Sequence, residues 1–236
     1  MRLPKKISPD SIKDAIVEFK IDYLKPFEVV LGLVLNEAIN DQTYKYVNAS
    51  NNVPLEIQEI SGRRFLFYNE NIKFHLTSKA ITINCYSAYI SWDLYLQEIT
   101  KVIGLVNKVV SKIKIERIGL RYVSEYENID LNECLKFNFT FGHPNITSKH
   151  YTFNSEFIYK SALIILTLRN LMPVNATNNS KNVSYIDIDV IKKDLEIEFS
   201  INEKLLVVLE EVHQYEKEIF FNLLKEEFLQ TLQPEY

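Results

Sequence analysis

Glycine is scarce in this chain: there are five in 236 residues, and no two of them are close in the sequence. A P-loop or a dinucleotide-binding turn needs several glycines together, because only then can backbone N–H groups approach a phosphate closely. The sequence therefore lacks the motifs of the common nucleotide-dependent enzymes. We expect the protein to use no cofactor.

Cysteine and histidine are also few. Cys85 and Cys134 stand in unrelated contexts, and the four histidines have no ligand spacing with them, so no zinc motif is present. Two isolated cysteines do not make the disulfide framework of a small secreted domain, which favours a reducing compartment. Neither cysteine has the surroundings of an activated nucleophile, and no G-x-S-x-G elbow occurs. We expect no metal site.

Long hydrophobic runs and a surplus of positive charge are both missing. The longest apolar run covers residues 162–168, whereas a membrane-spanning helix needs about 20 residues. The charged N-terminal segment is not followed by the apolar stretch of a signal peptide. The net charge is −4, and nonspecific nucleic-acid binding depends on an excess of Lys and Arg. We expect a cytoplasmic protein that binds neither membranes nor nucleic acids.

Short alternating segments separated by turn residues predict many antiparallel strands. These segments cover residues 14–23, 44–47, 55–60, 64–69, 72–77, 80–86, 114–126, 135–141, 151–159, 161–169 and 183–191. A wide apolar stripe predicts a helix after each of three starting signals. The signals are Pro26, Ser91 as a cap, and the capping box Ser200-x-x-Glu203, whose helix runs to about Gln230.

These elements predict an α+β fold. We expect one or more antiparallel sheets of many short strands, with long helices packed on a face. Both parts of the sequence show a run of strands followed by one long helix. The chain is therefore either one compact unit or two similar halves, an N-terminal half at residues 1–128 and a C-terminal half at residues 129–236.

The strand predicted at residues 114–126 is the most informative segment, because the chain has only six arginines and two of them share a face here. Arg117 and Arg121 flank Gly119, and guanidinium groups bind phosphate or carboxylate bidentately. Arg169 ends another strand and would join them if the two strands were neighbours. We predict a ligand site at these three arginines. The alternative is a structural network in which each arginine pairs with a carboxylate, from Glu18, Glu98 and Glu125.

Two other sets of polar residues have simpler interpretations. Asp187 and Asp189 share one strand face, as the carboxylates of metal-dependent nucleases sometimes do, but we favour the interpretation that they lie on a solvent-facing edge. His213 would need a cleft and a partner to act as a general acid. A bond to a nearby carboxylate, such as Glu210 or Glu216, is the simpler reading. We assign no catalytic residue.

Aromatic residues make up 12% of the chain and gather at one predicted strand–helix junction. Aromatic side chains anchor many protein interfaces. We predict a partner-binding surface at four of them: Tyr89, Trp92, Tyr95 and Phe221. The alternative is that they line the rim of the core. Of the adjacent Phe220 and Phe221, we expect one in the core and the other exposed for a dimer or partner contact.

Three segments occur in this order: SIKDAIVEFKI, ERIGLRYV and VHQYEKEIFFNLLKEEFLQTL. Together they resemble a sporadically distributed family of uncharacterised prokaryotic proteins of about this length, which has no assigned function. The resemblance directs attention to Glu18, Arg117, Gly119, Arg121, His213 and Phe220. It implies no reaction. Its patchy distribution is typical of accessory genes, including antiviral defence and toxin–antitoxin modules.

The leading hypothesis is therefore a non-catalytic binding or regulatory accessory protein, which recognises a protein partner or a small anionic ligand. One alternative is a hydrolase or nuclease acting on a phosphorylated substrate. The arginines would then hold phosphate, and His213 or Glu18 would transfer protons. Another is a structural subunit of a homo-oligomer, for which Phe221 or Phe228 would be exposed.

Overall fold

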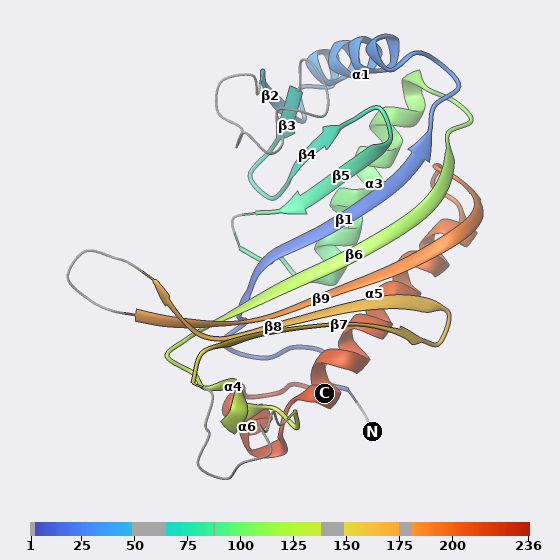
Figure 1. The fold of residues 1–236 in the computed structure, drawn as a ribbon. Coiled ribbons are helices and arrows are strands. Elements are labelled where there is room, and N and C mark those ends of the chain that lie inside the picture. Colours follow the sequence, from blue (N-terminus) through green and yellow to red (C-terminus); the bar gives the residue numbers. More distant parts are fainter. Residues whose placement is uncertain (1–2, 49–64, 87, 138–148, 175–180) are drawn as a thin grey trace. The chain divides into compact units, whose positions relative to one another are not determined.

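A computed structural model of the chain describes residues 3–48, 65–86, 88–137, 149–174 and 181–236 (Figure 1). The strands of these residues form one antiparallel sheet in the order β2-β3-β4-β5-β1-β6-β9-β8-β7. The predicted α+β class and the predicted antiparallel sheet are confirmed.

The strands are β1 (Ile12–Asp22), β2 (Lys45–Asn48), β3 (Phe65–Tyr68), β4 (Lys73–Leu76), β5 (Ala80–Cys85), β6 (Lys114–Glu127), β7 (Tyr151–Tyr159), β8 (Ala162–Val174) and β9 (Lys181–Glu198). The helices are α1 (Phe27–Asp41), α3 (Trp92–Val109), α4 (Leu131–Cys134), α5 (Glu203–Leu223) and α6 (Glu226–Thr231). The strand pattern at 55–60 lies outside the described residues, as does most of the pattern at 135–141.

The chain divides into two compact units that interleave along the sequence. Unit 1 comprises residues 1–13, 121–190 and 212–236, and unit 2 comprises residues 14–120 and 191–211. The divisions fall within β1, β6, β9 and α5. The units thus do not follow chain order, whereas the predicted halves do.

Unit 2 has its core between the sheet and α3. Side chains of β4 and β5 alternate strictly between buried and half-buried positions, because successive strand residues point to opposite faces. The buried set includes Phe19, Phe74 and Ile83, and the buried stripe of α3 covers that face (Figure 1). Gly104 of α3 faces the Ile201 side chain, whose Cδ1 would lie 3.7 Å from an added Cβ. Alanine therefore fits at this position.

Tyr95 connects α3 to two strands of unit 2. Its fully buried hydroxyl accepts a hydrogen bond from the Val17 N–H at 3.1 Å. The same hydroxyl lies 2.7 Å from the Ile83 carbonyl oxygen and 3.0 Å from that of Ala15, and donates to this pair. Burial raises the pKa of Tyr95 well above its ordinary value, so the hydroxyl stays protonated.

Replacing Tyr95 with Phe should lower the free energy of unfolding by about 2 kcal/mol, because buried backbone groups lose their partner. Chemical denaturation would measure the loss. The matched control is Tyr86→Phe, which removes an exposed hydroxyl that donates to the Asn69 carbonyl. An equal loss in both variants would contradict the assigned role of Tyr95.

In unit 1 the N-terminal and C-terminal segments of the chain are hydrogen-bonded to each other. The unit also contains a buried network of polar side chains. Lys6 and Glu235 form an antiparallel bridge, and Ser8 donates to the Leu232 carbonyl. The network centres on Asn170 of β8, which has no exposed surface. Its amide accepts from the Leu131 N–H at 2.7 Å. It also donates to the carboxylate of Asp130, the residue before α4, at 3.0 Å and to the carbonyl of Lys149, which precedes β7, at 2.9 Å.

Two predicted helix caps are wrong. Ser91 precedes α3 but its side chain makes no capping bond, since its backbone has a φ of 78°. At the last helix the cap is Asn202, whose Oδ1 accepts from the Leu205 N–H at 2.9 Å, in place of Ser200. The helix also stops at Leu223, and α6 follows after Lys225, whose N–H donates to the Cys134 carbonyl.

Candidate binding surface

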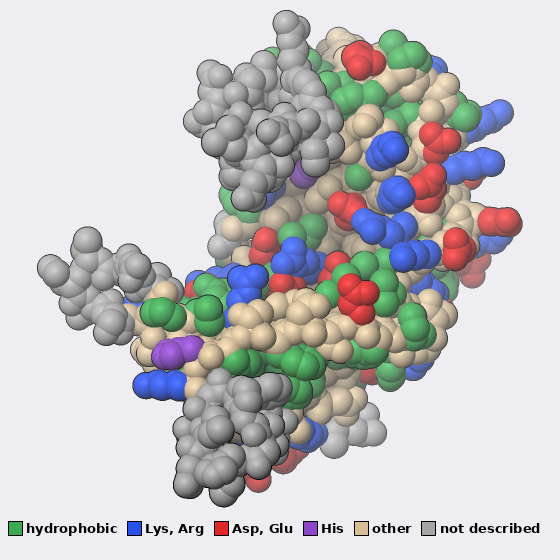
Figure 2. Space-filling view, viewed as in Figure 1, with side chains coloured by type: hydrophobic (Ala, Val, Ile, Leu, Met, Phe, Trp, Pro, Cys, Tyr) green, Lys and Arg blue, Asp and Glu red, His purple; other side chains and the backbone are tan. Residues whose placement is uncertain are grey.

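In each unit the helices lie on one side of the sheet, and no described helix covers the opposite side (Figure 1). This uncovered side is called the open face. Figure 2 views it and shows Lys and Arg side chains intermixed with Asp and Glu. The alternation of each strand determines which residues reach this face. In unit 1 they are Arg121, Val123, Glu125, Thr167, Arg169, Tyr185, Asp187 and Asp189.

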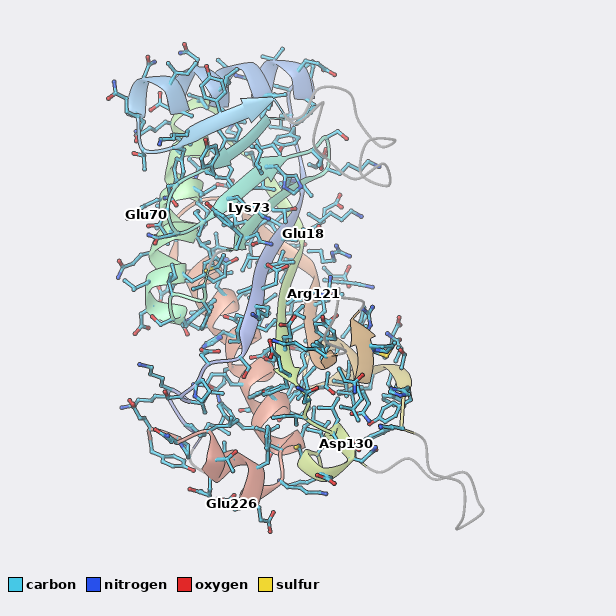
Figure 3. All side chains as sticks on the ribbon, turned by 90° about the vertical axis from the view of Figure 1, so that its left-hand side faces the viewer. Glu18, Glu70, Lys73, Arg121, Asp130 and Glu226 are labelled. Atoms are coloured by element: carbon cyan, nitrogen blue, oxygen red, sulfur yellow. The ribbon has the colours of Figure 1, made fainter. Side chains whose placement is uncertain are left out.

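Arg121, labelled in Figure 3, is a charged residue of the open face of unit 1 that forms two hydrogen bonds with one carboxylate. Its Nε donates to Asp187 Oδ1 at 2.8 Å and its Nη2 donates to Asp187 Oδ2 at 2.6 Å. β6 and β9 are neighbours in the sheet, which brings the two residues together. The Arg121 side chain is 45% exposed and that of Asp187 is 14% exposed. The guanidinium is therefore fixed in orientation while remaining accessible.

Arg169 does not adjoin Arg121. It is exposed on β8, and β9 lies between β8 and β6. We expect Arg169 to join the other arginines only if its strand is next to theirs, and β8 is not next to β6. Tyr185 lies on β9, the strand between those of the two arginines. Its pKa is raised by burial and by the nearby Glu125 carboxylate. Within the described part of the chain Arg169 has no hydrogen bond or ion pair. Its ligand-binding role stays a prediction.

Arg117 is on the open face of unit 2 and is paired with Glu18 of β1. The predicted alternative, an ion pair with this carboxylate, is therefore present. A second pair joins Lys20 to Glu116 at 3.4 Å. Glu18 and Lys20 alternate on β1 and share a face, but their partners are consecutive on β6. β6 therefore changes phase by one residue there, as a strand with a β-bulge does.

The other two carboxylates proposed for the arginines have different partners. Glu98 is buried in α3, where it accepts from Asn69 at 2.9 Å and pairs with Lys101 at 2.6 Å. Glu125 pairs with Lys13 at 3.5 Å. The ion network thus exists, but it uses lysines as well as arginines.

His213 lies on the helix side of unit 1, opposite the open face. Its Nδ1 is 3.4 Å from the hydroxyl of Tyr122, which is adjacent to Arg121 and therefore points the other way. Burial, followed by the charge of Lys217, lowers the pKa of His213 to about 3. The ring is therefore neutral at pH 7. It cannot transfer a proton at a phosphate held by Arg121, because the sheet lies between them.

The aspartates of β9 do not form a metal centre in the part of the chain that the structure describes, where no cluster of three His, Cys, Asp or Glu side chains could hold an ion. Asp187 is occupied by Arg121. The prediction of an edge strand is wrong, since β9 is an interior strand between β6 and β8.

Three of the four predicted partner-binding aromatics have buried side chains. Tyr95 is fully buried, and Trp92 is 8% exposed and donates its Nε1–H to Glu210 at 3.0 Å. Phe221 packs against Phe220 with ring centroids 5.2 Å apart, and both rings are buried. The expectation that one of this pair is exposed is wrong. Tyr89 is half-buried, and its partner-binding role stays a prediction.

The sequence matches no protein-family model, and no curated protein matches it significantly. The resemblance to a sporadic prokaryotic family therefore stays a prediction. Among the described helices, none combines the length and the apolar character needed to cross a membrane.

Proposed function

We propose that the chain is a non-catalytic accessory protein that docks a protein partner through the open face of unit 1. The observation that carries the proposal is the exposed Arg121, held bidentately by Asp187 on a sheet face without a described helical cover. Arginine is among the residues that contribute most to protein interfaces. A guanidinium already fixed in place also loses little conformational entropy on binding.

A protein partner suits this surface better than a small anion. Arg121 is neutralised by Asp187, and Lys13 by Glu125. A phosphate bound at Arg121 would meet the Asp187 carboxylate, and like charges repel at short range. A protein surface can instead present both signs of charge opposite this alternating pattern, which gives specificity. Half-buried Val123 adds apolar area beside the ion pair.

The same reasoning leaves the hydrolase alternative without a supporting observation. His213 is on the other side of the sheet from Arg121, and Glu18 is engaged with Arg117. An accessory component of a defence or toxin–antitoxin system remains our proposal for the biological setting. It rests on the resemblance of three sequence segments alone.

The test compares variants in cross-linking and affinity capture from the native host, followed by binding measurements with the purified partner. Arg121→Lys keeps the charge but loses the bidentate geometry, and we expect about 30-fold weaker binding, typical of an interface hot spot. The matched control is Lys108→Ala, which removes an exposed charge from α3 that pairs with Glu37 and Asp41. A partner that binds the Arg121 variant as tightly as the control would overturn the proposal.

A further inference from the structure

β7 is the last strand of the sheet, and no described strand pairs with its outer edge. It is nine residues long. Natural edge strands usually carry proline, lysine or a bulge, which prevent pairing with another chain. The sequence of β7, YTFNSEFIY, has no proline and no lysine, and Glu156 is its one charged residue. Ile158 is 72% exposed and Phe157 is 36% exposed.

The turn after β7 determines which backbone groups face the outer edge. Tyr159 pairs with Ala162 of β8 across a loop of two residues. A two-residue hairpin closes on a hydrogen-bonded pair, and such pairs alternate along the strands. The odd-numbered residues of β7 therefore bond to β8. The N–H and C=O groups of the even-numbered residues point outward, from Thr152, Asn154, Glu156 and Ile158.

We propose that this edge binds the β7 edge of a second copy of the chain, antiparallel and about a two-fold axis at Ser155. In this register Thr152 is opposite Ile158 of the other copy, and Asn154 is opposite Glu156. Every outward N–H and C=O of the four even-numbered residues then has a partner. The proposal concerns a different surface from the open face and does not depend on partner binding there.

The side chains fit this register on the helix side of the sheet. Odd-numbered residues face that side, as Phe153 packs against Phe137 with ring centroids 4.6 Å apart and Tyr159 against Tyr215 at 5.9 Å. Across the two-fold axis Phe153 would stand opposite Phe157, in a pair without backbone hydrogen bonds, where side chains are closest. Aromatic pairs of this kind stabilise antiparallel sheets. The exposed ring of Phe157 would thereby be covered.

The side chains also fit on the open side. Asn154 donates to Thr167 of β8 at 2.7 Å, which places the even-numbered residues on this side. The single charge, Glu156, would stand opposite an amide, so no like charges meet directly. Ile158, the most exposed large apolar residue of the described chain, would be opposite a threonine. The segment is therefore complementary to itself, which favours a second copy over an unrelated strand.

The test uses two double variants of the full chain that differ in one charge. Thr152→Lys with Ile158→Lys places like charges opposite each other at both ends of the register. Thr152→Lys with Ile158→Glu places opposite charges there. We expect light scattering with size exclusion to show a concentration-dependent dimer for the native chain and the Lys/Glu variant, and a monomer for the Lys/Lys variant. Circular dichroism verifies that each is folded.

A cysteine at the two-fold axis tests the register directly. In Ser155→Cys the two thiols would face each other across the axis, with Cβ atoms about 4.5 to 5.5 Å apart, close enough to bridge with a small adjustment. We expect an oxidised covalent dimer. Glu156→Cys, whose side chain would face Asn154 of the other copy, should form no covalent dimer under the same oxidation. A monomeric native chain, a Lys/Lys dimer, or equal cross-linking of both cysteine variants would each overturn the proposal.

Discussion

Replacing Glu216 with Gln should raise the free energy of unfolding at pH 7 by about 3 kcal/mol, since each unit of pKa shift corresponds to about 1.4 kcal/mol. Glu216 lies on α5 and is 6% exposed. Burial is the main reason that its pKa is raised from 4.5 to about 8; the charge of Lys217 opposes this shift, and the Asp10 carboxylate adds to it. The native protein therefore holds a proton at pH 7 that the unfolded chain releases.

The sign of the pH dependence follows from this proton. Between pH 4.5 and about 8 the folded state binds more protons at Glu216 than the unfolded state does. Stability therefore decreases as the pH rises through that window. Gln does not titrate, so the variant should lose this decrease and match the native chain in acid. Urea unfolding at several pH values would measure both effects.

His213 provides an internal reference with the opposite sign. Its pKa is lowered to about 3 by burial and then by Lys217. Stability should therefore decrease as the pH falls from about 6.5 toward 3, because the unfolded state then binds the extra proton. Glu216→Gln should keep this acid-side decrease. Glu227→Gln, at an exposed site of α6, should change neither side. An unchanged slope above pH 6.5 in the Glu216 variant would contradict the assignment.

Local sequence patterns predict the individual strands and helices of this fold better than they predict which strands pair with one another. The alternation in β5 and the apolar stripe of α3 require no knowledge of the rest of the chain, because each depends on one side of a single element. The sheet order is different, since pairing of β1 with both β5 and β6 depends on long-range packing. The interior position of β9 illustrates this. Asp187 and Asp189 alternate with apolar residues on either an edge or an interior strand.

The site shows the same division. Arg117 and Arg121 are recognisable in the sequence because charged residues on a mostly apolar strand require partners. The identity of those partners is harder to obtain, because Arg121 and Asp187 are 66 residues apart. The burial of both Phe220 and Phe221 could also not be predicted from the sequence. A helix stripe predicts one buried face, whereas here the side chains of both consecutive residues are buried.

Replacing Asn170 with Ala should lower the free energy of unfolding by about 3 to 4 kcal/mol, because a buried donor is left unsatisfied and further hydrogen bonds are lost. The donor that would lose its partner is the N–H of Leu131, the first residue of α4, which is fully buried. Asp130, labelled in Figure 3, would lose the amide but keep the Asn132 N–H at 2.9 Å. Ser184 still donates to the Ile129 carbonyl.

The matched control is Asn132→Ala, which removes a side-chain bond to the same Asp130 oxygen from a half-buried position. We expect it to cost less than about 1 kcal/mol, since water can replace the lost group. Urea denaturation would compare the two variants, and hydrogen exchange at Leu131 would locate the effect. If both cost the same, Asn170 is an ordinary core residue. A larger loss at Asn170, with faster exchange at Leu131, follows only if its amide holds α4 against β8.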